Sequence, residues 1–150
     1  MAEAFLLQYN HKFRINTEPG TDPGTLTPIA AGITSIDPNN NEETDESFYY
    51  DGDGGGSTDV TGIKKVITFE GHRKYGDLAQ DFIFGLTNKT GPDRKTDFEW
   101  EFPDGQLISG PVTIVNIKDP GGDANSKGEI SFEIHFEGLP DVTAPTTTTT

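Results

Sequence analysis

The residues most suggestive of chemistry are the aspartates and glycines of the stretch DGDGGGSTD, residues 51–59. A calcium loop of the EF-hand type needs oxygen ligands at its first, third and fifth positions, a glycine at its sixth and a glutamate at its twelfth. Counted from the first aspartate, Asp53 and Gly56 fall in register, but Gly55 has no side-chain oxygen and Gly62 occupies the glutamate position. A phosphate-binding loop would need a Lys-Ser/Thr pair and a following helix, whereas a β-patterned run follows here. We therefore interpret the stretch as a mobile Gly/Asp loop that holds no metal or other cofactor.

Catalytic constellations are also missing from the sequence. The chain has no cysteine, and it contains no HExxH motif, no histidine pair at ligand spacing and no GxSxG elbow. His135 stands near Glu133 and Glu137, which we interpret as a surface histidine beside carboxylates. Glu99 and Glu101 resemble a glycosidase pair in type, but any amphipathic strand places residues i and i+2 on one face. The sequence therefore predicts a protein that is not an enzyme.

The distribution of charge excludes one further class of function. The formal net charge is -14, and ten Asp or Glu but no Lys or Arg lie between Asn16 and Ile63. Such a block repels nucleic acid, whose binders carry clustered Lys and Arg.

No segment approaches the length needed to span a bilayer, so we expect no membrane partner. The apolar patch near the N-terminus is too short for a signal peptide, which favours synthesis in a cytoplasm.

The elements that must position these residues are mostly β-strands. Alternation and turn chemistry predict strands at residues 9–15, 29–36, 63–69, 97–102, 107–118 and 129–137, with a short additional strand possible at 48–50. Apolar residues at helical spacing predict one helix at 75–86, with Asp77 at its N-terminal end. The expected fold is mainly β, an antiparallel β-sandwich or partial barrel with one flanking helix and a long acidic loop.

The chain is organised as one domain and a tail. We assign residues 1–140 to the β domain, with residues 38–62 as a long flexible loop. Residues 141–150 form a Thr/Pro-rich disordered tail or linker. A loop of this length inside a compact domain is typical of a functional or disordered segment.

Without a catalytic site, the acidic loop and the exposed sheet edges favour assembly. An acidic loop can become ordered by docking on a basic surface. The candidates for that surface follow the acidic loop in the sequence: Lys64, Lys65, Arg73 and Lys74. Repeated head-to-tail contacts between copies would produce rings or filaments.

Four stretches together carry a resemblance to a known family. They are GHRKYGDLAQDF at 71–82, FEWEFPDG at 98–105, GGDANSK at 121–127 and EISFEIHFEGLP at 129–140. Their order and spacing resemble the major tail tube proteins of long flexible-tailed, siphovirus-like phages of Gram-positive bacteria. The resemblance covers residues 69–140 well and the N-terminal half in layout only.

The resemblance implies a structural virion protein. Its subunits would form homo-hexameric rings that stack into a tail tube around the tape measure protein, with tail terminator and distal tail proteins as further partners. The tube would be assembled in the host bacterial cytoplasm and would pass DNA without binding it. The loop at 38–62 would reach a neighbouring ring through Asn39, Glu42, Glu43, Asp45, Glu46, Asp51, Asp53 and Asp59. A carboxylate-lined lumen would repel phosphates, and its candidates are Glu99, Glu101, Glu133 and Glu137.

Two alternatives remain open at this stage. The first is an extracellular β-sandwich that binds carbohydrate or calcium, with Asp51, Asp53, Asp59 and Trp100 as its contacts. The second is a small hydrolase that uses Glu99 or His135.

Overall fold

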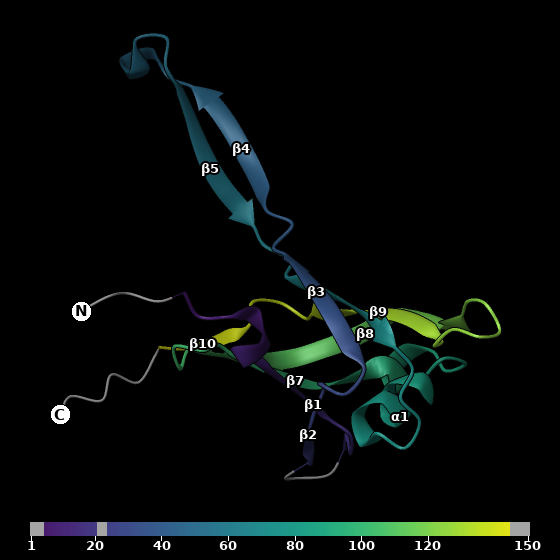
Figure 1. The fold of residues 1–150 in the computed structure, drawn as a ribbon. Coiled ribbons are helices and arrows are strands. Elements are labelled where there is room, and N and C mark those ends of the chain that lie inside the picture. Colours follow the sequence, from purple (N-terminus) through teal and green to yellow (C-terminus); the bar gives the residue numbers. More distant parts are fainter. Residues whose placement is uncertain (1–4, 21–23, 145–150) are drawn as a thin grey trace.

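One antiparallel sheet of eight strands makes up the body of the molecule (Figure 1). The computed structural model describes residues 5–20 and 24–144. The strand order is β2-β1-β7-β8-β9-β6-β3, and β10 pairs with the start of β8, beside the part that β9 covers. The strands of this sheet are β1 Lys12–Asn16, β2 Leu26–Pro28, β3 Ile33–Asn39, β6 Val66–His72, β7 Lys95–Glu101, β8 Leu107–Gly121, β9 Glu129–Phe136 and β10 Asp141–Thr143. The sheet does not close into a barrel, because β2 and β3 remain edge strands.

The core lies on one face of this sheet and follows directly from strand alternation. In β9 the side chains at Ile130, Phe132, Ile134 and Phe136 are buried, while those between them are exposed or partly exposed. Successive side chains of a strand point to opposite faces, so alternate apolar residues enter one core. Phe69 of β6 stacks on Phe132, with ring centroids 5.0 Å apart. The predicted mainly β class with one helix is confirmed.

Helix α1, Leu78–Phe84, covers one side of the core and packs against β8 and β2. Asp77 caps its N-terminus by accepting a hydrogen bond from the backbone N–H of Gln80, 3.2 Å away. Ala79 and Ile83 are fully buried on its inner face. The predicted helix and its acidic start are therefore present, and three short 3-10 turns complete the helical content of the described residues: η1 Gln8–Asn10, η2 Tyr50–Gly52 and η3 Gly91–Arg94.

A buried glutamine joins the helix to two strands. The side-chain amide of Gln80 donates to the backbone carbonyls of Ala31 and His72 at 2.7 and 3.1 Å, and its oxygen accepts from the Lys74 N–H at 2.8 Å. Gln80 is fully buried. The Gln80 amide thus supplies hydrogen-bond partners to backbone groups just before β3 and at the end of β6.

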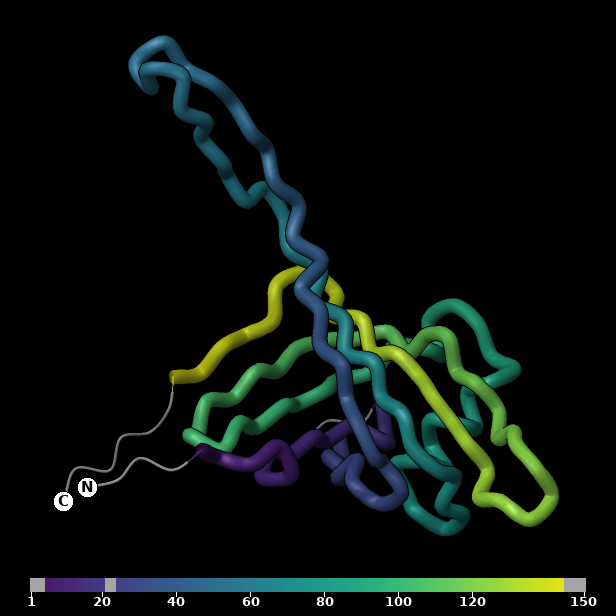
Figure 2. The backbone as a smooth tube through the Cα atoms, turned by 45° about the horizontal axis from the view of Figure 1, so that its top comes forward, coloured from purple at the N-terminus to yellow at the C-terminus, as the bar shows by residue number. Residues whose placement is uncertain are grey.

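A two-stranded hairpin leaves the body as a long arm, which we define as residues 42–62 (Figures 1 and 2). It consists of β4, Glu43–Phe48, the turn η2 and β5, Gly56–Gly62. In Figure 2 the arm continues the line of β3 away from the body. The prediction that residues 38–62 form a loop without regular structure is therefore wrong. β4 and β5 pair through their backbones, although the hairpin buries no apolar face. Residues 48–50 are not a strand of their own but the end of β4 and the start of the turn.

The Gly/Asp stretch of the sequence forms the tip and the returning strand of the arm. Asp53 has a left-handed backbone, with φ of 50°, and Gly54 follows with φ of 88°. Glycine and aspartate tolerate this region, which explains their presence at the turn. From Gly56 onward the same stretch pairs with β4.

Several predicted boundaries shift for physical reasons. Residues 9–15 divide into η1 and β1, and residues 29–36 contain a turn between β2 and β3. The predicted tail at 141–150 begins with β10, which gains backbone hydrogen bonds by pairing with β8, while residues 145–150 lie outside the described part of the chain.

Candidate assembly surfaces

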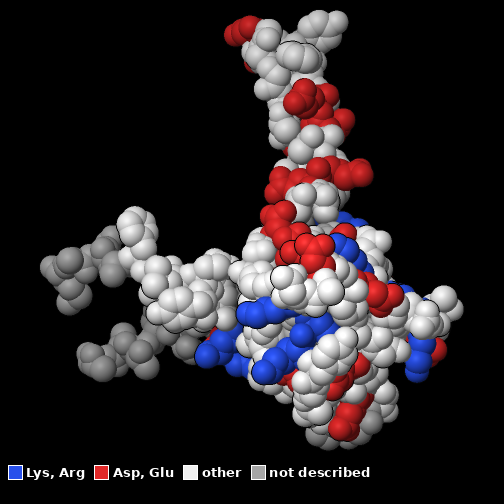
Figure 3. Space-filling model, turned by 45° about the vertical axis from the view of Figure 1, so that its right-hand side comes forward, with Lys and Arg blue, Asp and Glu red and all other residues white. Residues whose placement is uncertain are grey.

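The arm carries all of the predicted acidic stacking residues, whereas Asn39 ends β3. Figure 3 shows Asp and Glu along the arm and Lys and Arg on the body. Asp45 lies directly opposite Asp59 in the β4–β5 register. Like charges at opposite positions destabilise a strand pair, and an isolated hairpin is at best marginally stable in water. A partner that screened or paired the carboxylates of the arm would therefore stabilise it.

The tip of the arm exposes three consecutive aromatic residues that were not among the site residues predicted from the sequence. Phe48 is 73% exposed, Tyr49 57% and Tyr50 107%. The Phe48 ring lies over Gly56 of the facing strand. The sequence did contain a signal for an interface at this point. Three aromatic residues stand in a polar segment, and a polar hairpin has no core that requires them. Exposed aromatic groups of this kind are typical anchors of protein interfaces.

The base of the arm is fixed by polar contacts with the predicted basic residues Lys64 and Lys65. The Lys64 N–H donates to the Asn40 carbonyl at 2.9 Å, and the Lys65 ammonium donates to the Asn40 side-chain oxygen at 2.8 Å. The Asn41 amide donates to the Lys64 carbonyl at 3.1 Å. Partial burial lowers the pKa of Lys65. These contacts set the direction in which the arm leaves the body.

The four predicted basic residues do not form one surface. Lys64 and Lys65 precede β6, whereas Arg73 and Lys74 follow it, so even the nearest members, Lys65 and Arg73, are about 26 Å apart at about 3.3 Å per residue. Arg73 is also occupied within the subunit. Its guanidinium pairs with Asp81 at 2.9 Å and lies over the rings of Tyr75 and Phe84, so only 9% of its side chain is exposed.

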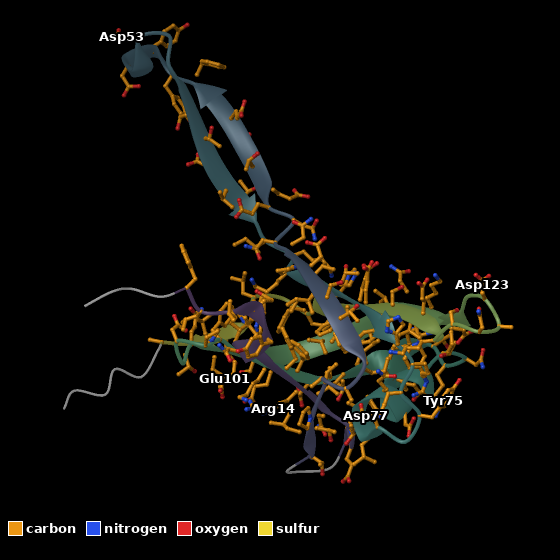
Figure 4. All side chains as sticks on the ribbon, in the orientation of Figure 1. Arg14, Asp53, Tyr75, Asp77, Glu101 and Asp123 are labelled. Atoms are coloured by element: carbon orange, nitrogen blue, oxygen red, sulfur yellow. The ribbon has the colours of Figure 1, made fainter. Side chains whose placement is uncertain are left out.

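The four predicted lumen carboxylates do share one face of the sheet, the face opposite the core. Glu99 and Glu101 alternate with the buried Phe98 and Trp100 on β7. The guanidinium of Arg14 on β1 donates to Glu99 at 3.0 Å and to Glu101 at 3.3 Å. Arg14 and Glu101 are labelled in Figure 4. One arginine therefore partly neutralises both carboxylates.

The other two carboxylates lie near the C-terminal end of β9. Glu133 is 3.0 Å from the His135 ring nitrogen and accepts from Asn116 at 3.0 Å, and these hydrogen bonds lower its pKa, with His135 as the larger cause. The Thr113 hydroxyl donates to Glu137.

Lys95 also pairs with Glu137 at 2.9 Å. The Thr113 hydrogen bond and then the Lys95 contact lower the pKa of Glu137 to about 2. All four carboxylates thus have partners in the subunit. His135 was visible beside Glu133 in the sequence, but Arg14, Asn116, Thr113 and Lys95 come from distant segments and could not be inferred as partners from the sequence.

Other carboxylates on the same face carry the unbalanced charge. Among the residues that the structure describes, Asp37, Asp97 and Glu129 have no ion pair. By strand register they lie on β3, β7 and β9, on the face opposite the core. The face is therefore acidic overall, although Glu99, Glu101, Glu133 and Glu137 have partners.

The alternative binding sites lose their main contacts in the structure. Trp100 is only 4% exposed, and its indole N–H donates to His11 at 3.0 Å, so it cannot stack on a sugar. Burial lowers the pKa of that histidine, and a smaller contribution from Asp104 opposes this. Within residues 5–20 and 24–144, no group of three or more His, Cys, Asp or Glu is placed to hold a metal ion. In the same residues, no helix is long and apolar enough to cross a membrane.

Comparison with known proteins gives the clearest assignment of the fold. No family model matches the sequence, and no curated protein matches it significantly. A chain from the tail of an empty gene transfer agent particle, refined helically with C6 symmetry, superimposes with a TM-score of 0.72 at 19% identity. The match covers 93% of this chain and 100% of that one. The chain has the fold of a phage-like tail protein.

Two further structures agree with this fold. A chain from the virion of the native gene transfer agent gives a TM-score of 0.69 at 17% identity, covering 93% of this chain and 100% of the other. A chain from the anti-feeding prophage cap, a tube-terminating cap, gives 0.63 at 15% identity, covering 95% and 93%. These neighbours belong to tails, virions and tube caps, and none is named as an enzyme.

Proposed function

We propose that this protein is the structural subunit of a phage-like tail tube. Its copies form hexameric rings that stack into a tube around a tape measure protein and become part of the virion after assembly in the host cytoplasm. Tail terminator and distal tail proteins close the ends. The observation that carries the proposal is the projecting arm on a body with the tail-protein fold, because a free hairpin needs a neighbour to stabilise it.

The arm supports ring stacking rather than ring closure. It continues β3 away from the body, and in Figure 1 its tip lies far from the sheet edges β2 and β3 that could face copies within a ring. Its exposed aromatic tip and its carboxylates are suited to a contact with a copy displaced along the arm. The eight stacking residues predicted from the sequence are part of this proposal, and their carboxylates would guide the approach of the two copies. They are Asn39, Glu42, Glu43, Asp45, Glu46, Asp51, Asp53 and Asp59.

The acidic sheet face is suited to line the lumen. Carboxylates repel phosphates, and DNA that slides through a tube must not bind its wall. The paired carboxylates Glu99, Glu101, Glu133 and Glu137 give this wall a polar surface, and the unpaired ones supply the negative potential. The siphovirus-like, Gram-positive origin implied by the sequence resemblance belongs to the same proposal.

The test is negative-stain electron microscopy of the purified protein at high concentration, with light scattering over time. We expect rings or hollow tubes. The matched variant lacks residues 43–62, which removes the hairpin while leaving the Asn40 contacts at its base intact. Because Glu43 pairs with Gly62, the cut ends lie side by side and can be joined.

The variant is expected to keep its β-rich circular dichroism and thermal transition but to form no tubes. Tubes from the variant would refute the role of the arm. Single rings that never stack in the intact protein would instead favour a role at the end of a tube, as in the tube-terminating neighbour. A persistent monomer, even with a tape measure protein present, would refute the tube proposal.

A further inference from the structure

The aromatic tip of the arm has a matching groove on the body. This groove lies between the two edges of the open sheet, where β1 and the turn before β3 approach each other. Its volume is about 440 Å³, and its apolar lining includes Tyr9, Phe13, Ile29, Ile33 and Ile36. Phe13, Ile33 and Ile36 pack against the core but are only partly buried, so apolar surface remains available.

We propose that the arm of one copy inserts Tyr50 and its aromatic neighbours into this groove on a second copy. The inference rests on the proposed function and names the contact that stacks the rings. Phe48, Tyr49 and Tyr50 act as the anchors, since aromatic side chains that enter a pocket supply most of the energy of an interface. The carboxylates of the shaft remain at the rim.

The absence of Asp, Glu, Lys and Arg from its lining distinguishes this groove from three other grooves of the described surface. The tip carries Asp51 and Asp53 beside its aromatic residues, so a receiving groove with carboxylates would repel it. The three other grooves carry charges of both signs: Asp93 with Lys89 and Lys95, Glu101 with Lys12, and Glu70 and Glu129 with Lys118. None of them offers the aromatic rings an uncharged surface. The lining of the groove between the sheet edges contains no Asp or Glu.

The length of the arm fits a contact between copies. The groove lies beside the first half of β3, and the tip lies at the far end of the run that continues this strand. From Ile36 to Tyr50, at about 3.3 Å per residue, the separation is about 45 Å. This exceeds the length of β6, about 23 Å, which leaves room for the body of a second copy.

The absence of cysteine from the chain makes a crosslinking test unambiguous. Ala30 is exposed in the lining of the groove, so we would combine Ala30→Cys with Tyr50→Cys, assemble tubes at a protein concentration high enough to offset the loss of the Tyr50 ring, and oxidise them. The expected product is a ladder of disulfide-linked oligomers on a non-reducing gel. The matched control combines Tyr50→Cys with Lys89→Cys, which lies in the groove beside α1.

A second measurement tests how much the Tyr50 contact contributes to polymerisation. Tyr50→Ala is expected to raise the protein concentration needed for tube formation by at least about tenfold, whereas Tyr75→Ala, at another exposed tyrosine, is expected to change it less than about twofold. The axial repeat of the tubes should not exceed about 45 Å.

Crosslinking through Lys89→Cys alone, an unchanged polymerisation threshold for Tyr50→Ala, or a longer repeat would each overturn the groove assignment. If tubes form without the Ala30–Tyr50 crosslink, the inference fails while the proposed function stands. If no tubes or rings form at all, the proposed function fails first.

Discussion

The substitution Gln80→Leu should destabilise the subunit strongly, although it replaces one buried side chain by another of similar size. Leucine cannot donate to the carbonyls of Ala31 and His72, so two acceptors lose their partners. A buried polar group without a hydrogen bond costs about 1 to 3 kcal/mol. The N–H of the exposed Lys74 can reach water and adds little.

The expected loss is therefore about 3 kcal/mol, which for a chain of this size lowers the Tm by about 10 °C. Urea unfolding followed by circular dichroism measures the free energy of unfolding directly. Gln106→Leu is the control, because the described contacts give that side chain no hydrogen bond and we expect a change below about 0.5 kcal/mol. A loss below about 1 kcal/mol for Gln80→Leu would refute the argument that this amide joins the helix to the strands.

Two further predictions concern the charged sheet face. The pKa of Glu137 is lowered in the folded protein to about 2, so the carboxylate stabilises the fold above the unfolded pKa near 4.5 and this contribution disappears as the pH falls toward 2. The stability difference between the wild type and Glu137→Gln, measured by urea unfolding, should accordingly be larger at pH 6 than at pH 2.5, and a difference independent of pH would contradict this account. Asp97→Lys places a cation on the unpaired part of the face, and particles built from this variant should assemble normally but release DNA more slowly in a fluorescence ejection assay. An unchanged ejection rate would count against this face as the lumen wall.

The parts of the fold that bury apolar residues could be predicted from the sequence. The alternation in residues 129–137 indicated β9, and the helical spacing around Leu78 with Asp77 before it indicated α1. These signals are local, because burial on one face repeats every two residues in a strand and about every 3.6 in a helix.

The arm and the sheet order could not be predicted in the same way. The β4 sequence ETDESF buries no apolar face, so it resembles a loop, and its ladder depends on pairing with β5. The partners of the sheet carboxylates, such as Arg14 for Glu99, come from segments 85 residues apart. A bulge in β8, where Asn116 has φ of 52°, shifts the register with β9 and leaves no local sequence signal.

The facing aspartates of the arm also affect how free subunits meet. A projecting hairpin offers two open strand edges, which in a neutral sequence would invite arms to add to one another as a growing sheet. With Asp45 opposite Asp59 and no cation on the arm, two arms that approach side by side bring four carboxylates together and repel. The body of another subunit, which holds all of the lysines and arginines, is the less repulsive target. The same charges that weaken the isolated arm can therefore keep a concentrated pool of subunits from aggregating before a tube is started.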